Sequence, residues 1–523
     1  MGSKLFLLVL ASVSVTNSLA QTHNSVPRLV VGITIDNLRT DYLNAFAPLY
    51  GEGGFKKLLL EGKIYYNAQY SSSNIDRASS IASIYTGTVP YNHGIIGVNW
   101  MDRATMRPKF CVDDFKYRGY DTNDYSSPNN LLVSTIGDEL KLATEGRSVV
   151  YSIAPFREAA VISAGHSADY ALWIDNNNGN WAGSSYYGKK PNWTRNLSSY
   201  SISDKLNDVV WEPLNDNVNN FNYYLSKEQK SFKHTFTGEY AIKQYKTSAL
   251  INEEVTHAAK QCILYSTIGN DWTPDLLSLC YYAGTFNGIF FTQSSMELQD
   301  TYVRLDYQIE NLLKEIDRTV GLNNTLIFVT STGYDNVPNN DDLSKYRIPT
   351  GDFEINRCAA LLNMYLIAIY GQGQYVESYY GNQLYLNHKL IEQKQVNFIE
   401  VLERCQDFLY RVSGVSDVYT SQRLSQGGLS FEVNKVRNAY NPKCSGDIII
   451  QVSPGWNLVN EDLGSVVMSR DSYFYFPLIF YGLNIKGEII KTPTSIERIA
   501  PTISHFMRIR APNACSASPL TDL

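Results

Sequence analysis

A carboxylate at the end of a predicted buried strand is the first feature of this sequence that can do chemistry. Asp36 directly follows the apolar run LVVGITI at positions 29–35, and such runs are typical of strands buried on both faces. In parallel sheets, functional side chains gather at the carboxyl ends of the strands. Asp36 is therefore a candidate cation ligand, or a structural carboxylate that needs a counter-charge.

Three further sets of side chains are candidates for chemistry, and each also has a structural interpretation. Ser79 and Ser80 lie at a predicted helix start, where serines usually cap or pack, and no base is near them in sequence. The apolar surroundings of Cys280 favour burial or a disulfide over a reactive thiol. Trp181 and Trp193 can stack on a sugar or a partner, with core packing as the alternative.

Metal-binding motifs are not evident among the histidines and cysteines. The chain has seven of each, but they form no CxxC pair and no Cys/His cluster with zinc spacing. Export would permit disulfides, and the odd number of cysteines leaves at least one thiol unpaired. The sequence leaves the pairing open.

Buried strands that alternate with helices predict the fold class. The runs at 325–330 and 477–481 resemble the first strand, and residues 300–316 carry apolar side chains at helical spacing. This order predicts an α/β domain, a three-layer α/β/α sandwich around a mainly parallel central sheet. Two regions with weaker periodicity, at about 170–260 and about 335–470, predict insertions that cap the strand ends.

The N-terminus predicts export. Lys4, an apolar run that is short for a membrane span, and small residues at 18 and 20 predict a signal peptide at 1–20, cleaved after Ala20. We therefore expect a periplasmic or secreted protein that spans 21–523 as one domain with its insertions. No later stretch reaches transmembrane length. The net charge of -6 argues against a nucleic-acid partner.

Several blocks in order along the chain resemble the alkaline-phosphatase superfamily, in its secreted monomeric branch with a threonine nucleophile. Its active site is similar to that of nucleotide pyrophosphatase/phosphodiesterases. The blocks are VVGITID at 30–36, YGEGGF at 50–55, SIYTGTVP at 83–90, HGI at 93–95, AGH at 164–166, DTYVRLD at 300–306, PLIFYG at 477–482, IAPT at 499–502 and PNAC at 512–515.

The resemblance implies a site with two zinc ions, a threonine nucleophile and phosphoryl-binding Asn, Lys and Arg side chains. Asp36 keeps one zinc-ligand position. The nucleophile position falls on Arg77, which cannot act as a nucleophile. The phosphoryl-binding positions fall on Val98, Phe156 and Glu158, and a glutamate there would repel phosphate. The other zinc-ligand positions fall on Thr285, Ile289, Thr332, Gly333 and Tyr475.

This joint loss leads to a prediction of a pseudoenzyme. We expect no zinc cofactor, a salt bridge between Arg77 and Asp36 in the vacated site, and a secreted pseudophosphatase that acts as a scaffold or accessory subunit of a cell-envelope protein complex. One alternative is a phosphate- or sulfate-ester hydrolase with a rebuilt site. The other is a glycan- or peptide-binding module that uses the old cleft with Trp181 and Trp193.

Overall fold

Parallel strands form the centre of a twelve-stranded sheet, in the order β13-β1-β12-β7-β8. The computed structural model describes residues 26–73, 75–197, 201–220, 231–288, 295–334, 347, 349–426, 430–461, 465–468 and 475–523. The central strands are β1 (Leu29–Asp36), β7 (Val150–Ala154), β8 (Tyr170–Ile174), β12 (Asp275–Tyr282) and β13 (Thr325–Ser331). Every residue of β1 is buried, as expected for a strand covered on both faces.

Further strands extend this parallel core on both sides, mostly through antiparallel pairing, although β22 and β23 pair parallel with β2. On one side β13 pairs with β21, which pairs with β2, and on the other side β8 pairs with β9, which leads to β5 and β6. These outer strands are β2 (Lys63–Gln69), β5 (Asp113–Tyr120), β6 (Tyr125–Ser126), β9 (Trp181–Ser184), β21 (Phe476–Gly482), β22 (Glu488–Ile490) and β23 (Thr494–Ser495).

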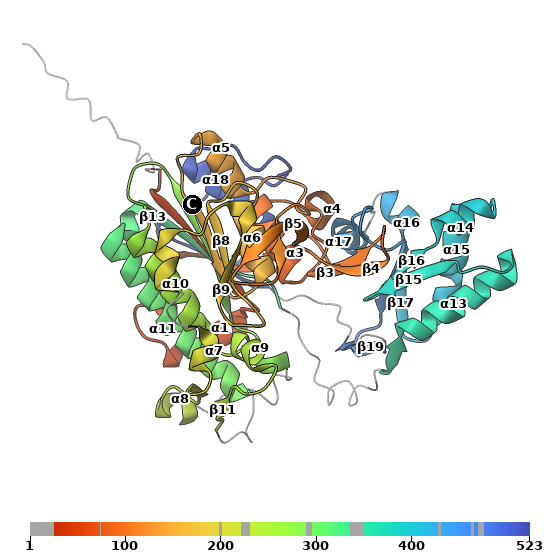
Figure 1. Ribbon diagram of the computed structural model, residues 1–523, viewed down its shortest axis with the longest axis horizontal. Coiled ribbons are helices and arrows are strands. Elements are labelled where there is room, and N and C mark those ends of the chain that lie inside the picture. Colours follow the sequence, from red (N-terminus) through yellow and green to blue (C-terminus); the bar gives the residue numbers. More distant parts are fainter. Residues whose placement is uncertain are drawn as a thin grey trace, which may run out of the picture.

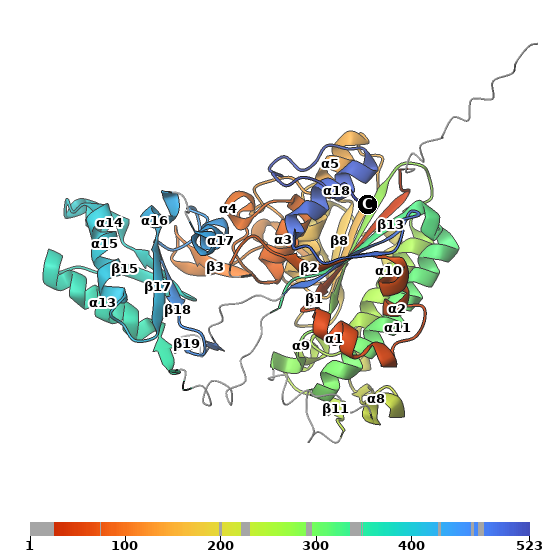
Figure 2. The ribbon, with the colours of Figure 1, turned by 180° about the vertical axis from the view of Figure 1, so that it is seen from behind.

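Helices cover both faces of the sheet. Figures 1 and 2 show α10 (Ile251–Tyr265) and α11 (Ser295–Thr319) together on one side of it. On the other side lie α3 (Arg77–Thr86), α5 (Ile136–Ala143), α6 (Arg157–Ala164) and α18 (Ile499–Met507). The predicted α/β/α fold with a mainly parallel sheet is confirmed.

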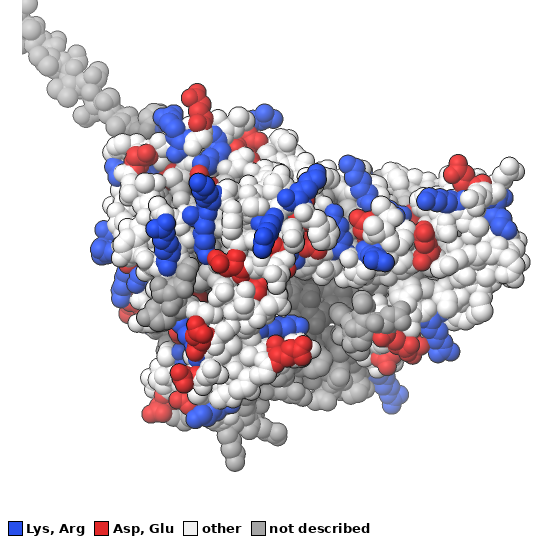
Figure 3. Space-filling model, in the orientation of Figure 1, with Lys and Arg blue, Asp and Glu red and all other residues white. Residues whose placement is uncertain are grey.

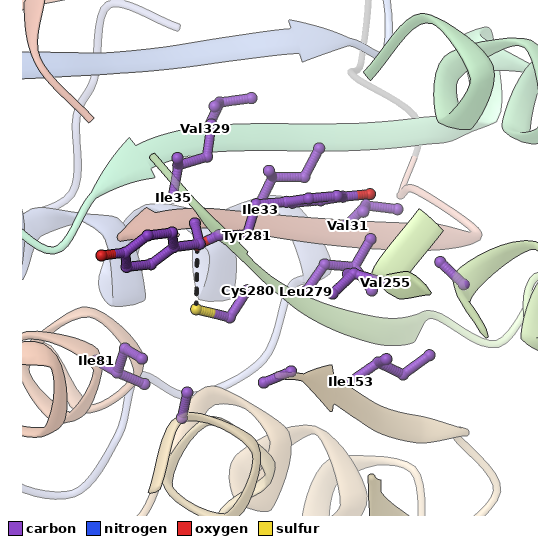
Figure 4. Close-up of a cluster of buried hydrophobic side chains, with 14 of the residues drawn as sticks. Val31, Ile33, Ile35, Ile81, Ile153, Val255, Leu279, Cys280, Tyr281 and Val329 are labelled. Atoms are coloured by element: carbon purple, nitrogen blue, oxygen red, sulfur yellow. Dashed lines mark hydrogen bonds between the residues drawn. The ribbon is translucent and has the colours of Figure 1, made fainter. Parts of the chain in front are cut away.

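Close packing of α3 against β1 brings the start of the helix to the end of the strand. In Figure 4, Ile33 of β1 and Val329 of β13 lie in one buried cluster with Ile81 of α3. A Cβ atom at Gly32 would lie 2.5 Å from the ring of Phe328 and 2.6 Å from the hydroxyl oxygen of Tyr85 in α3. Glycine is therefore required at this position for the helix to approach the sheet so closely.

A second lobe lies beside the main body, on the right in Figure 1. It has its own hydrophobic cluster and an antiparallel four-stranded sheet in the order β15-β16-β18-β17. Its elements are β14 (Asp352–Glu354), α13 (Ile355–Tyr370), β15 (Val376–Tyr380), β16 (Gln383–Leu386), α14 (His388–Gln393), α15 (Phe398–Leu409), β17 (Val415–Thr420), α16 (Ser421–Ser425), α17 (Phe431–Ala439), β18 (Ile448–Val452), β19 (Asn457–Asn460) and β20 (Ser465–Met468).

The predicted insertions differ in how they relate to the sheet. The described part of 335–470 forms the second lobe. The region 170–260, in contrast, begins with β8 and β9, which are strands of the central sheet, so any cap starts after Ser184. The periodicity is weak there because β9 is an antiparallel strand of only four residues. The domain boundaries themselves stay a prediction, and the predicted signal peptide lies outside the described residues.

Short elements complete the main body. They are α1 (Thr40–Ala45), α2 (Phe55–Glu61), α4 (Pro90–His93), β3 (Asn99–Asp102), β4 (Arg107–Phe110), α7 (Ile202–Lys205), β10 (Val210–Trp211), α8 (Asp216–Asn220), β11 (His234–Thr235) and α9 (Ala241–Lys246). Among the described residues, no helix combines the length and apolar character needed to cross a membrane.

Candidate functional site

A cavity of about 280 Å³ lies at the carboxyl ends of β1 and β13, beside the start of α3. This is the edge of a parallel sheet at which binding sites are usually found. Its lining residues come from those two strand ends, from the first residue of α3 and the two residues before it, and from the loop before β3. They are Asp36, Asn37, Ile75, Asp76, Arg77, Val98, Thr332, Gly333 and Tyr334.

Asp36 is buried at the end of β1 and is fully engaged by neighbours. Its side chain is 4% exposed. Oδ2 accepts hydrogen bonds from Nε and Nη2 of Arg77, at 2.9 and 2.7 Å, and Oδ1 accepts one from Oγ1 of Thr332 at 2.5 Å. The predicted salt bridge between Arg77 and Asp36 is therefore confirmed. It supplies the counter-charge that a buried carboxylate requires.

The start of α3 fixes where Arg77 lies. Asp76 is the N-cap, and its Oδ1 accepts a hydrogen bond from the backbone N–H of Ser79 at 2.9 Å, which closes a capping box. Arg77 is the first residue of the helix, where the helix dipole disfavours a cation. Ser80 Oγ donates to the backbone oxygen of Thr332 at 2.6 Å. Both serines thus have the structural roles that the sequence favours.

Arg77 joins Asp36 to a second buried carboxylate on a different helix. Its Nη1 lies 2.6 Å from Oε1 of Glu158 in α6, whose side chain is 6% exposed. The guanidinium carbon lies 3.4 Å from the centre of the Phe156 ring, within cation–π range. Burial lowers the pKa of Arg77, but Asp36 and Glu158 raise it more, so the guanidinium stays charged. The arginine neutralises Glu158, a pairing that the sequence did not predict.

Asp76, at the wall of the cavity, has a raised pKa. Burial raises it, while N–H donors from Ser79 and Val98 lower it in part. The backbone N–H of Val98 donates to Oδ2 at 2.5 Å. Val98 itself lines the cavity with an apolar side chain where the resemblance implies an asparagine. A carboxyl group with a raised pKa beside a cavity is suited to exchanging protons.

The other predicted zinc-ligand positions are only partly brought together. Thr332 and Gly333 line the cavity. Thr285 and Tyr475 are not among the lining residues. The backbone oxygen of Thr285 accepts from the Tyr282 hydroxyl, and Tyr475 is 44% exposed. Ile289 lies outside the described residues.

The described side chains around Asp36 do not fit a pair of zinc ions. Zinc sites need at least three protein ligands of the Cys, His, Asp or Glu type. In the part of the chain that the structure describes, no group of three or more such residues is placed to hold a metal. No step of a mechanism can therefore be derived through zinc from these residues.

Trp181 and Trp193 do not offer ring faces to solvent. They are 5% and 4% exposed, and the Trp193 ring lies edge-on to Tyr151 at 5.4 Å. Their alternative interpretation, core packing, fits this burial. The proposed glycan or peptide contact through these two residues has no support.

Lys246, the last residue of α9, is a cation near the site that the sequence did not single out. It is 2% exposed, and its Nζ donates to the backbone oxygen of Ile174 at 2.8 Å. Nζ also lies 5.1 Å from the centre of the Phe156 ring. No sequence signal could have found it, because an isolated lysine 90 positions after Phe156 has no spacing relation to that residue.

Comparison with known proteins shows which family and which named proteins the chain resembles. Residues 30–473 match the family described as type I phosphodiesterase / nucleotide pyrophosphatase. The chain is 29% identical to alkaline phosphatase PhoV of Synechococcus elongatus, with 95% of this chain and 93% of PhoV covered. It is 30% identical to a calcium-transporting ATPase of Myroides odoratus, with 95% and 94% covered. A crystal structure of alkaline phosphatase PafA is 27% identical, with a TM-score of 0.81 over 95% of this chain and 99% of that one.

These relatives overturn three predictions. Two of them are named as alkaline phosphatases and resemble the chain over nearly its whole length, which contradicts a pseudophosphatase that acts as a scaffold or accessory subunit. For the same reason, the prediction that the protein is not an enzyme is wrong. The prediction that it uses no zinc cofactor is also contradicted, because alkaline phosphatases are zinc enzymes. The sequence argument failed because it judged catalysis from the side chains at expected positions alone.

The superfamily resemblance read from the sequence blocks agrees with these comparisons. The matched region extends from the second residue of β1 into the segment before β21, and so covers the central parallel strands and the cavity. The chain therefore belongs to the type I phosphodiesterase / nucleotide pyrophosphatase family, within the alkaline-phosphatase superfamily.

Proposed function

We propose that the protein hydrolyses phosphate esters in the cavity beside Asp36, at a site rebuilt around Arg77. The observation that supports this most is the charged cluster of Asp36, Arg77 and Glu158 at the cavity, in a chain that resembles alkaline phosphatases from end to end. An arginine at a strand-end cavity is a natural partner for phosphoryl oxygens.

Arg77 would bind and orient the substrate. A guanidinium group has five N–H bonds. Nε, Nη1 and Nη2 each donate to a carboxylate, Asp36 or Glu158, and these contacts leave two N–H bonds for an oxygen in the cavity. A sulfate ester presents the same kind of oxygens to the guanidinium and is the second candidate substrate.

Asp76 would act as the general acid and donate a proton to the departing ester oxygen. Its raised pKa lets it hold a proton at higher pH than an ordinary aspartic acid. Hydrolysis by water requires a proton for the departing ester oxygen, and a protonated Asp76 at the cavity wall can supply it. Thr332 and Arg77 keep Asp36 fixed, so Asp36 serves to hold the guanidinium in place.

We further propose that the protein acts in the periplasm or outside the cell. The predicted signal peptide at 1–20 supports this location. Mass spectrometry of the purified mature protein should find Gln21 as the first residue. A mature chain that starts at Met1 would contradict export through this peptide.

Turnover of p-nitrophenyl phosphate and p-nitrophenyl sulfate by the mature chain tests the proposed function. We expect turnover that falls by about 10²-fold or more in Asp36→Ala and Arg77→Lys. Arg423→Lys is the matched control, because Arg423 pairs with Asp417 at 2.6 Å in the second lobe. Runs with added zinc and after chelator treatment measure how far turnover depends on a metal. Turnover that both site variants leave unchanged would refute the rebuilt site.

A further inference from the structure

The positive charges beside Phe156 and Glu158 come from distant parts of the chain. Arg77 of α3 contacts both side chains, at 3.4 Å from the Phe156 ring centre and 2.6 Å from Glu158. Lys246 of α9 approaches the same Phe156 ring at 5.1 Å. The two positions at which the family resemblance implies a lysine and an arginine thus lie next to an arginine and a lysine from other elements.

Lys246 is held in one place inside the protein. Its Nζ donates to the backbone oxygen of Ile174, at the end of β8, and to Oδ1 of Asn176 at 2.5 Å. It is not among the residues that line the cavity and is 2% exposed. It therefore cannot touch a substrate in this arrangement, and any effect on the site must act through its charge.

The charged groups that face Lys246 come from four elements. Glu158 of α6 and Arg77 of α3 have the largest effects, followed by Asp175 after β8 and Asp124 before β6. Burial lowers the pKa of Lys246 to about 7, Glu158 raises it and Arg77 lowers it. The side chain therefore changes its charge close to neutral pH.

The balance of charge at the site depends on this lysine. Asp36 and Glu158 together carry as much negative charge as Arg77 and a protonated Lys246 carry positive charge. When Lys246 is neutral, the cluster has an excess of negative charge, which repels an anion. On the face drawn in Figure 3, basic and acidic side chains are intermixed, whereas Arg77 and Lys246 both lie beside the Phe156 ring.

We propose that Lys246 is a positioning residue for anion binding. Its protonated form offsets the charge of Glu158, so that the two N–H bonds of Arg77 that no carboxylate accepts can attract an oxyanion, and it sets the upper pH limit for binding a phosphate or sulfate group in the cavity. This inference rests on the proposed function, because it assigns the cavity to an oxyanion. To that proposal it adds that the ligand is an anion and that binding of the anion weakens when Lys246 loses its proton.

The sulfate ion is the probe for the test, because its charge does not change near neutral pH. Sulfate affinity of the mature chain is measured by calorimetry at about pH 6 and about pH 8.5, on either side of the Lys246 pKa of about 7. We expect wild-type affinity to fall by about tenfold between the two, the size expected for loss of one nearby charge. Lys246→Met should bind weakly at both pH values. Lys246→Arg should keep its affinity at the higher pH, since arginine stays charged.

Lys141→Met is the matched control, because Lys141, on α5, pairs with Asp169 at 2.7 Å and does not line the cavity. It should bind sulfate like the wild type at both pH values. The inference would be overturned if Lys246→Met bound sulfate with the same affinity and the same pH dependence as the wild type. It would also be overturned if the wild type bound no sulfate at either pH. Binding that follows Lys246 in a protein without turnover would support the inference while the proposed hydrolysis fails.

A second measurement does not depend on any ligand. A lysine whose folded pKa of about 7 lies below its ordinary value of 10.5 destabilises the folded state when protonated. This penalty is complete below about pH 7 and disappears as the pH rises toward 10.5. The melting temperature of the wild type should therefore rise relative to that of Lys246→Met across this range. A constant difference between the two would show that Lys246 does not titrate there and would overturn the inference.

Discussion

Arg77 donates two hydrogen bonds to the same carboxylate oxygen of Asp36, from Nε at 2.9 Å and from Nη2 at 2.7 Å. The two residues are 41 positions apart, and they meet because α3 begins where β1 ends. Glu158 takes the third side of the guanidinium at 2.6 Å. The centre of the site is thus an arginine between two buried carboxylates, and its energetics can be tested directly.

Removal of the arginine should destabilise the protein strongly. In Arg77→Met, two carboxylates that are 4% and 6% exposed lose their counter-charge, which costs about 3–5 kcal/mol. Urea unfolding followed by circular dichroism measures the loss in free energy of unfolding. Arg423→Met is the control, because its pair with Asp417 is partly exposed and should cost about 1 kcal/mol or less. Equal losses in the two variants would contradict the role of Arg77 as the counter-charge of two buried carboxylates.

Asp76 should control the alkaline limb of the pH profile. A proton on Asp76 is favoured in the folded state, so the protonated form persists above the ordinary aspartate pKa and is lost as the pH rises. Asp76→Asn should lower the turnover of an aryl phosphate by about 10²–10⁴-fold and remove that limb. Initial rates across the pH range, compared with those of Asp102→Asn, measure this. Asp102 caps an exposed turn and has no part in the cavity. An unchanged profile would exclude Asp76 as the proton donor.

The contact between the main body and the second lobe should weaken in acid. Asp447, 4% exposed, accepts hydrogen bonds from Arg103 of the β3–β4 hairpin at 3.1 Å and interacts with His388 at 2.9 Å. Burial raises the pKa of Asp447, but His388 and Arg103 lower it below the ordinary value. The stabilisation is therefore present above the ordinary aspartate pKa and is lost as the pH falls through the lowered value. Asp447→Ala should abolish this dependence.

Limited proteolysis and hydrogen exchange between the lobes at about pH 7 and about pH 3 measure this effect. The wild type should open at the lower pH, and Asp447→Ala should be open at both. Asp407→Ala, on an exposed face of α15 in the same lobe, serves as the control and should behave like the wild type. Protection that does not change with pH in the wild type would contradict the role of Asp447.

The buried tryptophans should contribute to stability and not to ligand binding. Trp181→Ala and Trp193→Ala each create a cavity in the main core, and each should cost about 3–5 kcal/mol of unfolding free energy. Trp272, 75% exposed, is the control, and Trp272→Ala should cost less than about 1 kcal/mol. Denaturant unfolding of the three variants measures this. Binding of a glycan that depends on Trp181 or Trp193 in a fully stable variant would reverse the conclusion.

The fold class could be predicted because it depends on local patterns. Each central strand is an apolar run that only a doubly covered sheet can bury, and the helix at 300–316 has a continuous apolar face. The family blocks lie on the same elements, so the superfamily could be recognised. Strand β9 was missed because a short antiparallel strand leaves little periodicity.

The sequence by itself determined the central strands, the place of Asp36 at the end of the first one, and the cation expected to neutralise it. Only the tertiary structure decided that Arg77 also pairs with Glu158 and that Lys246 lies near the Phe156 ring. It also decided that Trp181 and Trp193 are buried. The physical reason is that strand and helix patterns depend on neighbours within a few residues. Charge pairing, hydrogen bonding and burial depend on contacts between distant segments, such as that between Asp36 and Thr332, which are 296 positions apart, and the order of residues along the chain does not encode such contacts.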